Sequence, residues 1–170
     1  MSTVQKITTN LWFNDQAEEA ARFYTTVFPN SKTGRVTHYG KEGQEIHGRP
    51  PGSVMTIEFY LNGQIFLALN GGSHFKFTEA ISFIVNCDDQ KEVDYYWQQL
   101  SEGGDEKAQM CGWLKDKFGL SWQIVPSLLQ QLISSSDSER SGRVMKAMLQ
   151  MKKLDIETLR RAAEEENVAT

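Results

Sequence analysis

The side chains of this sequence that could do chemistry are few, and their spacing is not that of a metal site. The three histidines, His38, His47 and His74, fall in an expected strand, a polar loop and a connecting segment. Metal ligands in proteins recur at short characteristic spacings, and these three do not. Because His74 lies between Phe75 and Phe77, we expect it to be a packed, hydrogen-bonded connector residue. The alternative is an acid or base at the rim of a pocket.

The two cysteines, Cys87 and Cys111, form no Cys-x-x-Cys pair and are too few for a disulfide framework. We therefore expect two reduced, buried thiols. Cys111 could act as a nucleophile only beside a base, and the sequence pairs it with no histidine. The chain also lacks Gly-x-Gly-x-x-Gly, Gly-x-x-x-x-Gly-Lys-[Ser/Thr] and Gly-x-Ser-x-Gly. Phosphate-binding loops and serine-hydrolase elbows are therefore not expected.

The elements that must position a site belong to a chain of roughly one-domain size. It has 170 residues, of which 39% are hydrophobic and 24% charged, so it can bury a core. The net charge of −4 argues against a nucleic-acid partner, which would require a basic face. No apolar run approaches the ~20 residues that span a bilayer, and the first residues show no signal-peptide pattern. We expect a cytoplasmic protein with no membrane partner.

Hydrophobic periodicity predicts the same order of elements twice. A strand over 4–13, helix over 15–28 and three further strands are followed by a strand over 80–86, aligned with an offset of 72, and a helix over 88–104. Asn14 or Asp15 should cap the first helix, and Asn62-Gly63 predicts a hairpin. The remaining strands are expected at 32–39, 54–61, 64–70, 107–115 and 120–125. Residues 40–53, rich in glycine and polar residues, predict a mobile loop that could act as a lid.

After Pro126 the pattern becomes helical. We expect a helix over 127–133, a linker SSSDSERSG (134–142) and two more helices. The methionine-rich stretch 144–151 predicts an apolar helix face, which either packs on the sheet or contacts a partner subunit. The expected organisation is one domain over 1–126, with modules at about 1–72 and 78–126, and a helical extension over 127–170.

Four stretches carry a resemblance to the PhnB-like family, also described as 3-demethylubiquinone-9 3-methyltransferase-like, of the vicinal oxygen chelate superfamily. They are LWFNDQAEEAARFYTTVFPNS (11–31), FLALNGGSHFKFTEAISFIVN (66–86), CGWLKDKFGLSWQIVP (111–126) and VMKAMLQMKKLDIETLRRA (144–162). The superfamily includes glyoxalase I, extradiol dioxygenases and fosfomycin and bleomycin resistance proteins. The resemblance implies an α+β fold in which two βαβββ modules form a half-open, eight-stranded barrel around a cup, with C-terminal helices added. It also implies a homodimer.

The resemblance further identifies where metal-dependent members hold their ion. These positions fall at Thr8, Ala80 and Gln123, and at Leu67 or Ala68, because the hairpin allows either register. None of these side chains is an imidazole or a carboxylate, the donors that such metals require. We therefore expect no metal and no cofactor.

Alternation along strands predicts which side chains line the cup. Asn10, Trp12, Ser82, Ile84 and Gln123 should face it, together with Ala80 and Ser121. The fourth strand would add Phe66, Ala68 and Asn70 if Ala68 is the ligand position, and the face of Trp113 and Cys111 is left open. The opposite parity should lie under the helices and comprises Ile7, Leu11, Phe13, Ile81, Phe83, Val85, Trp122 and Ile124. The candidate ligand-binding residues are Trp12, Gln123, Asn10, Ser82, His74 and Trp113.

These residues favour a metal-free protein that binds a small neutral or weakly polar molecule. The alternatives are a cup filled by its own side chains and a glyoxalase-like metal-dependent lyase, isomerase or dioxygenase. A methyltransferase activity is suggested by the family label alone. The segment NDQAEEA after the first strand has no glycine to hold S-adenosylmethionine. In the leading interpretation the loop 40–53 closes the mouth of the cup.

Overall fold

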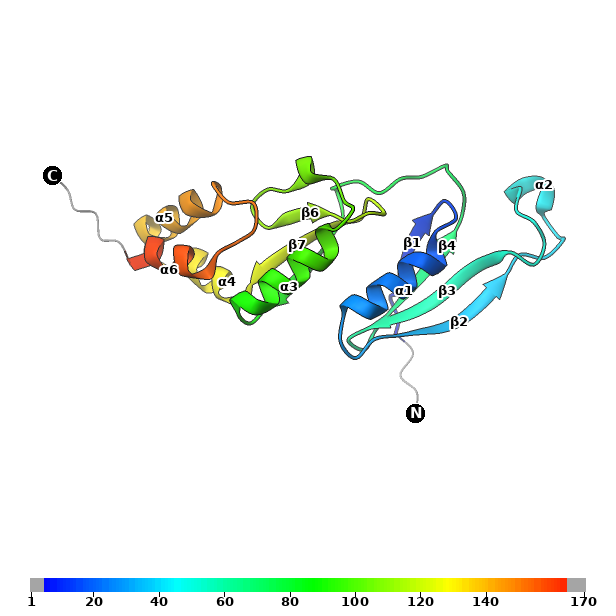
Figure 1. The fold of residues 1–170 in the computed structure, drawn as a ribbon, viewed down its shortest axis with the longest axis horizontal. Helices are drawn as coiled ribbons and strands as arrows, with labels where there is room; N and C mark the ends of the chain where they lie inside the picture. The colour runs from blue at the N-terminus through cyan, green and yellow to red at the C-terminus, as the bar shows by residue number, and fades with distance from the viewer. Residues whose placement is uncertain (1–4, 165–170) are drawn as a thin grey trace. The chain divides into compact units, whose positions relative to one another are not determined.

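The computed structural model describes residues 5–164 and divides into two compact units, with the boundary between Phe77 and Thr78. The first unit holds a mixed sheet in the order β1-β4-β3-β2, in which β1 and β4 are parallel and the other neighbours antiparallel (Figure 1). Its elements are β1 (Thr9–Phe13), α1 (Ala17–Val27), β2 (Lys32–His38), α2 (Gln44–His47), β3 (Val54–Leu61) and β4 (Gln64–Asn70).

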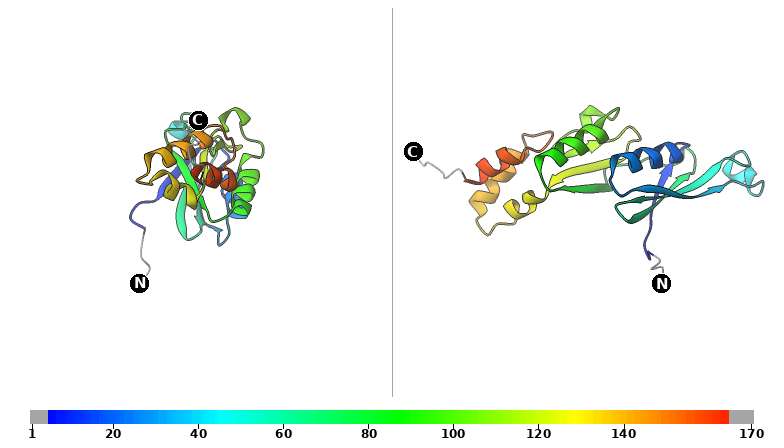
Figure 2. Two further views of the ribbon diagram at one scale, coloured as in Figure 1. Left: turned by 90° about the vertical axis from the view of Figure 1, so that its left-hand side faces the viewer. Right: turned by 60° about the horizontal axis from the view of Figure 1, so that its bottom comes forward.

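Helix α1 covers one face of this sheet, as Figure 2 shows. Its apolar residues recur at helical spacing, and the buried ones include Ala20, Ala21 and Tyr24. They pack against strand residues such as Phe59, which is fully buried and lies 6.0 Å from Tyr24 between ring centroids. This packing fixes which side of each strand is left facing away from the helix.

The cap of α1 differs from the expected one. Neither Asn14 nor Asp15 caps it; instead the buried Asn70 of β4 accepts a hydrogen bond from the Ala17 amide at 2.9 Å. The Asn70 amide group also donates to the Val54 carbonyl at 3.1 Å. Asn70 therefore joins the helix to two strands and does not line the cup, as it would if Ala68 were the ligand position.

The polar segment 40–53 contains more structure than the sequence indicates. It folds into the short helix α2 between two glycines with positive φ, Gly43 and Gly48. Arg49 donates to the Asn14 carbonyl, and the Tyr39 hydroxyl donates to the Asn70 carbonyl at 2.7 Å. The segment is thus tied to the residue that follows β1, and the tyrosine before it is tied to β4.

The second unit holds a three-stranded sheet in the order β5-β7-β6 and five helical segments. β5 and β7 are parallel, and β6 and β7 antiparallel. Its elements are β5 (Ser82–Cys87), α3 (Gln90–Ser101), the 3-10 helix η1 (Glu106–Ala108), β6 (Trp113–Lys115), β7 (Ser121–Pro126), α4 (Ser127–Ile133), α5 (Ser138–Met148) and α6 (Ile156–Glu164).

The α+β class is confirmed, but residues 5–164 form seven strands where the resemblance implies eight. The expected strand 107–115 is reduced to β6. Asp105 caps η1 by accepting from the Lys107 amide at 2.9 Å, and the chain then reverses in a tight turn between Met110 and Trp113. These local hydrogen bonds use the residues that would otherwise extend the sheet.

The C-terminal helices form a small core of their own beside the second sheet (Figure 1). The linker is shorter than expected, because Asp137 caps α5 by accepting from the amides of Glu139 and Arg140. The methionine-rich face is divided: Val144 is fully buried, whereas Leu149 is 57% exposed. The buried members of this core are Leu129, Leu132, Val144, Leu154, Leu159 and Ala163.

Two connections hold the C-terminal helices to the second sheet. The amides of Cys111 and Gly112 donate to the carbonyls of Met151 and Lys152, each at 2.8 Å. In addition, the Gln90 side chain donates to the Leu154 carbonyl at 3.1 Å and accepts from the Ile156 amide at 2.8 Å. Among the described helices, none is long and apolar enough to cross a membrane.

Candidate ligand-binding groove

The two faces of the second sheet differ in chemistry. Trp122 and Ile124 of β7 are buried on the face that α3 covers. On the opposite face, the strand register pairs Gln123 of β7 with Ile84 of β5 on one side and with Trp113 of β6 on the other. It also pairs Ser82 with Ser121. The predicted alternation along β5 and β7 is therefore found within this sheet.

A groove of about 620 Å³ lies over this open face. That volume lies within the usual range for a site that holds one small molecule. The sheet forms one part of its lining and helices α4 and α5 form another. The lining residues are all uncharged: Ile84, Asn86, Cys111, Trp113, Gln123, Val125, Pro126, Ser127, Leu129, Gln130, Ile133 and Met148.

Gln123 is the central polar side chain of the groove. It is half-buried, and its Nε2 donates to the Ser82 hydroxyl at 2.9 Å. The Ser82 contact fixes the carboxamide of Gln123 on the open face. The side-chain amides of Asn86 and Gln130 and the indole N–H of Trp113 make no hydrogen bond with any described residue. These groups can meet the polar groups of a ligand.

A tight turn places Cys111 and Trp113 at the groove. Met110 and Trp113 exchange backbone hydrogen bonds of 3.1 and 2.8 Å, and the two residues between them have φ values of 53° (Cys111) and 85° (Gly112). Positive φ at both central positions is the pattern of a type I′ turn. A Cβ at Gly112 would lie 3.0 Å from the Ile124 carbonyl oxygen. Alternation along the strand does not fix the face of Cys111 and Trp113. The structure shows that both residues line the groove.

The other three candidate residues lie in the first unit. Trp12 donates from its indole N–H to the Gly72 carbonyl at 2.8 Å and packs edge-on against Phe75 at 4.9 Å. Asn10 is exposed on the same face of β1. The prediction that His74 is packed is wrong: its side chain is exposed, while Phe75 and Phe77 make the aromatic contacts of this segment.

The strand register also settles the choice between Leu67 and Ala68. Ala68 pairs with the buried Leu11 and is itself fully buried on the helix-covered face. Leu67 pairs with Asn10 and is therefore the ligand-equivalent position. Phe66 shares the buried face of Ala68, so the alternative in which Ala68 is the ligand position and both residues line the cup is excluded.

The prediction that Ile7 and Ile81 lie under the helices is wrong. Ile7 and Ile81 are 85% and 71% exposed, respectively, because β1 begins only at Thr9 and β5 only at Ser82. Leu11 and Phe13, by contrast, are buried as predicted.

The metal positions of the superfamily do not fit an ion in this chain. They are occupied by Thr8, Leu67, Ala80 and Gln123. Among residues 5–164, no three histidine, cysteine, aspartate or glutamate side chains are grouped as metal ligands. A neutral amide alone cannot supply the donors that Zn²⁺ or Fe²⁺ requires.

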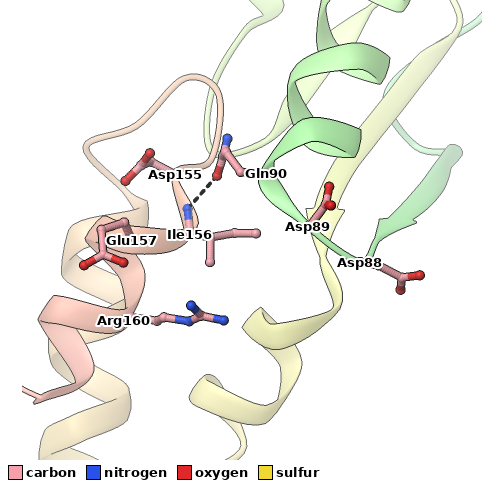
Figure 3. Close-up of a pocket in the computed structure, with 7 residues that line it drawn as sticks. All are labelled: Asp88, Asp89, Gln90, Asp155, Ile156, Glu157 and Arg160. Carbon is pink, nitrogen blue, oxygen red and sulfur yellow. Dashed lines mark hydrogen bonds between the residues drawn. The ribbon is translucent and has the colours of Figure 1, made fainter.

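A second hollow of about 260 Å³ lies between the first turns of α3 and α6 (Figure 3). Two of its four carboxylates cap helices: Asp89 accepts from the Glu92 amide, and Asp155 accepts from the Thr158 amide at 2.7 Å. The hydrogen bonds from Thr158 lower the pKa of Asp155. In Figure 3 the Gln90 side chain reaches the Ile156 amide across this hollow. These contacts assign the hollow a role in holding α6 to α3.

Comparisons with known proteins bear on somewhat less than three quarters of the chain. A family model described as 3-demethylubiquinone-9 3-methyltransferase matches residues 5–125. A PhnB protein from Bacillus cereus with the same description is 34% identical; the match covers 72% of this chain and 100% of that chain, with a TM-score of 0.63. Protein PA1353 from Pseudomonas aeruginosa is 17% identical over 72% of this chain and 98% of its own, with a TM-score of 0.54, and shows the same fold. A comparison with curated proteins gave no match.

Proposed function

The chain belongs to the 3-demethylubiquinone-9 3-methyltransferase (PhnB-like) family, and on this basis we propose that it binds a small uncharged molecule, without a metal, in the groove of its second unit. The observation that carries the proposal is the lining of the groove. Apolar side chains surround amide and indole groups that have no partner among the described residues, and no lining residue is charged.

This lining selects against charged ligands. A charged group that leaves water is costly unless an opposite charge or several hydrogen bonds meet it. The groove offers amides, hydroxyls and an indole, which suit carbonyl, amide or hydroxyl groups on a ligand. Trp113, Ile84 and Met148 supply apolar contact for a ring system.

The metal-free part of the proposal rests on the residue types at the ligand positions. We expect purified protein to contain far less than one equivalent of zinc, nickel, manganese or iron by elemental analysis. Treatment with a chelator should leave both thermal stability and ligand binding unchanged. Near-stoichiometric metal that is lost on chelation together with binding would contradict this part.

The family description names a methyl transfer, and the residues present do not fit S-adenosylmethionine. A doubly wound nucleotide site needs glycines in the turn after the first strand and free amides at the helix start. Here residues 14–16 are Asn-Asp-Gln, and the Ala17 amide is taken by Asn70. The first sheet is also mixed rather than parallel. We derive no methyl-transfer step for this chain.

Prodan, an uncharged naphthalene ketone whose emission moves to shorter wavelength in apolar surroundings, tests the proposal. We expect it to bind the protein with a blue shift. Gln123→Ala should weaken binding by about 0.5–1.5 kcal/mol, the value of a neutral hydrogen bond. Gln131→Ala is the matched control, because Gln131 is exposed on α4 and does not line the groove. Equal affinities for the two variants would contradict the proposal.

Folding stability distinguishes an open groove from one filled by its own side chains. If Gln123 serves a ligand, Gln123→Ala should change the melting temperature little, because only the exposed-face contact with Ser82 is lost. A fall of several degrees with no effect on prodan would indicate a structural role instead.

We further propose a cytoplasmic location. Cys87 and Cys111 are both free thiols, which is typical of proteins from a reducing compartment. Fractionation of cells that express the tagged full chain tests this; recovery of the chain outside the cytoplasmic fraction would contradict it.

A further inference from the structure

The lining of the groove comes from two parts of the chain. One set lies on the strands of the second sheet: Ile84 and Asn86 on β5, Trp113 on β6 and Gln123 on β7. A second set belongs to the C-terminal helices: Ser127, Leu129, Gln130 and Ile133 of α4 and Met148 of α5. Helices α4 and α5 therefore form one wall of the groove, and the sheet alone would present only an open face.

The helices lie beyond the region that the family model matches. The family model ends at residue 125, and α4 begins at Ser127. The whole Bacillus cereus chain is covered by 72% of this chain, so more than a quarter of this chain has no counterpart there. The helical wall thus lies outside the part of the chain that the family model matches.

We propose that α4 and α5 form a specificity wall, in which Gln130 selects the ligand of the groove. This inference rests on the proposed function and extends it. The sheet side presents the amides of Asn86 and Gln123, and the helix side presents that of Gln130. The ligand class is an uncharged ring compound with a carbonyl or similar group that can accept hydrogen bonds from both sides of the groove.

The packing of α4 makes this wall rigid. Leu129 and Leu132 are each 6% exposed and lie in the helical core with Val144 and Leu154. The Met148 side chain packs against the same core. A wall anchored in this way holds Gln130 at a fixed distance from the sheet, so it can discriminate ligands by size and by the position of a polar group.

Gln130 and Gln131 provide a matched pair for the test. They are the same residue type, adjacent on α4 and both exposed, but only Gln130 lines the groove. Affinities would be measured for prodan and for dimethylaminonaphthalene, which lacks the ketone, with wild type, Gln130→Leu and Gln131→Leu. Unchanged melting temperatures would confirm that both variants are folded.

We expect Gln130→Leu to lower the preference for prodan over dimethylaminonaphthalene by about 2- to 10-fold, the loss of one neutral hydrogen bond. Gln131→Leu should keep the wild-type preference. If Gln130→Leu also keeps it while Gln123→Ala weakens prodan binding, the specificity wall is overturned and the proposed function stands. If prodan binds wild type and Gln123→Ala alike, the proposed function fails, and the inference with it.

Discussion

At the scale of single residues, the two cysteines lie in opposite environments. Cys87 ends β5 and is fully buried; burial raises the pKa of its thiol to about 12, and the nearby carboxylates of Glu92, Asp88 and Asp89 add to this effect. Cys111 is half-buried and lines the groove. Because the thiolate is the reactive form, the two residues should differ strongly in reactivity.

We predict that one thiol per chain reacts with a disulfide reagent such as Ellman's reagent at pH 8 under native conditions, and both in denaturant. Cys111→Ser should abolish the native reaction, because the Cys87 thiol remains protonated and covered. Saturating prodan should slow the reaction of Cys111. Rapid native labelling in Cys111→Ser would show that Cys87 is accessible after all.

Local alternation explains which candidate residues could be predicted from the sequence. The alternation of side chains along strands predicts that Ser82 and Gln123 share one face, and the structure joins them by a hydrogen bond. Alternation does not predict the face of Trp113, because the turn before it depends on the positive φ of Cys111. The sequence does not indicate Gln130, because it is one of two adjacent glutamines in the middle of a short helix.

At the scale of elements, one buried carboxylate organises the β6–β7 turn. Asp116 is 2% exposed and accepts from the amides of Phe118 and Leu120 at 2.9 and 3.0 Å. Its second oxygen accepts from the Trp122 indole N–H at 2.8 Å. The turn sets the register of β6 on β7 and with it the position of Trp113 beside Gln123.

Asp116→Ala should lower the free energy of unfolding by about 3 kcal/mol, because buried donors lose their acceptor. Urea unfolding followed by far-UV circular dichroism measures this. Asp15→Ala is the control: Asp15 is exposed, and its replacement should cost less than about 0.5 kcal/mol. A similar small effect for both variants would refute the role given to Asp116.

The elements that the sequence predicted wrongly depend on distant or competing contacts. The cap of α1 comes from Asn70, which is 53 residues away from Ala17, so no local pattern indicates it. Within residues 5–164 the predicted strand 107–115 is shortened to β6, because η1 and the Met110–Trp113 turn occupy its first residues. Helix α5 begins at Ser138, inside the expected linker, because the Asp137 cap outweighs the low helix propensity of serine and glycine.

At the scale of the whole molecule, we propose a symmetric homodimer. Each sheet ends in outer strands, β1 and β2 in the first and β5 and β6 in the second. Exposed sheet edges favour association unless they are covered. Met145 of α5 and Leu149, the residue that caps its C-terminus, are 38% and 57% exposed, an apolar surface that a second copy could cover.

Sedimentation equilibrium at micromolar concentration should give twice the 19.3 kDa of one chain. Leu149→Glu should weaken the dimer if α5 contributes, whereas Lys146→Glu on the same helix serves as a control for the added charge. A mass of one chain at every concentration would rule out the dimer. An unchanged dimer in Leu149→Glu would exclude only the contribution of α5.

The location of the site is the central claim, and side-chain amide NMR tests it most directly. In a ¹⁵N-labelled full chain, saturating prodan should shift the amide resonances of Asn86, Gln123 and Gln130, which line the groove. The resonance of Gln131 on α4 should stay in place. Shifts confined to the first unit, such as that of Asn10, with Gln123 and Gln130 unmoved, would contradict the account.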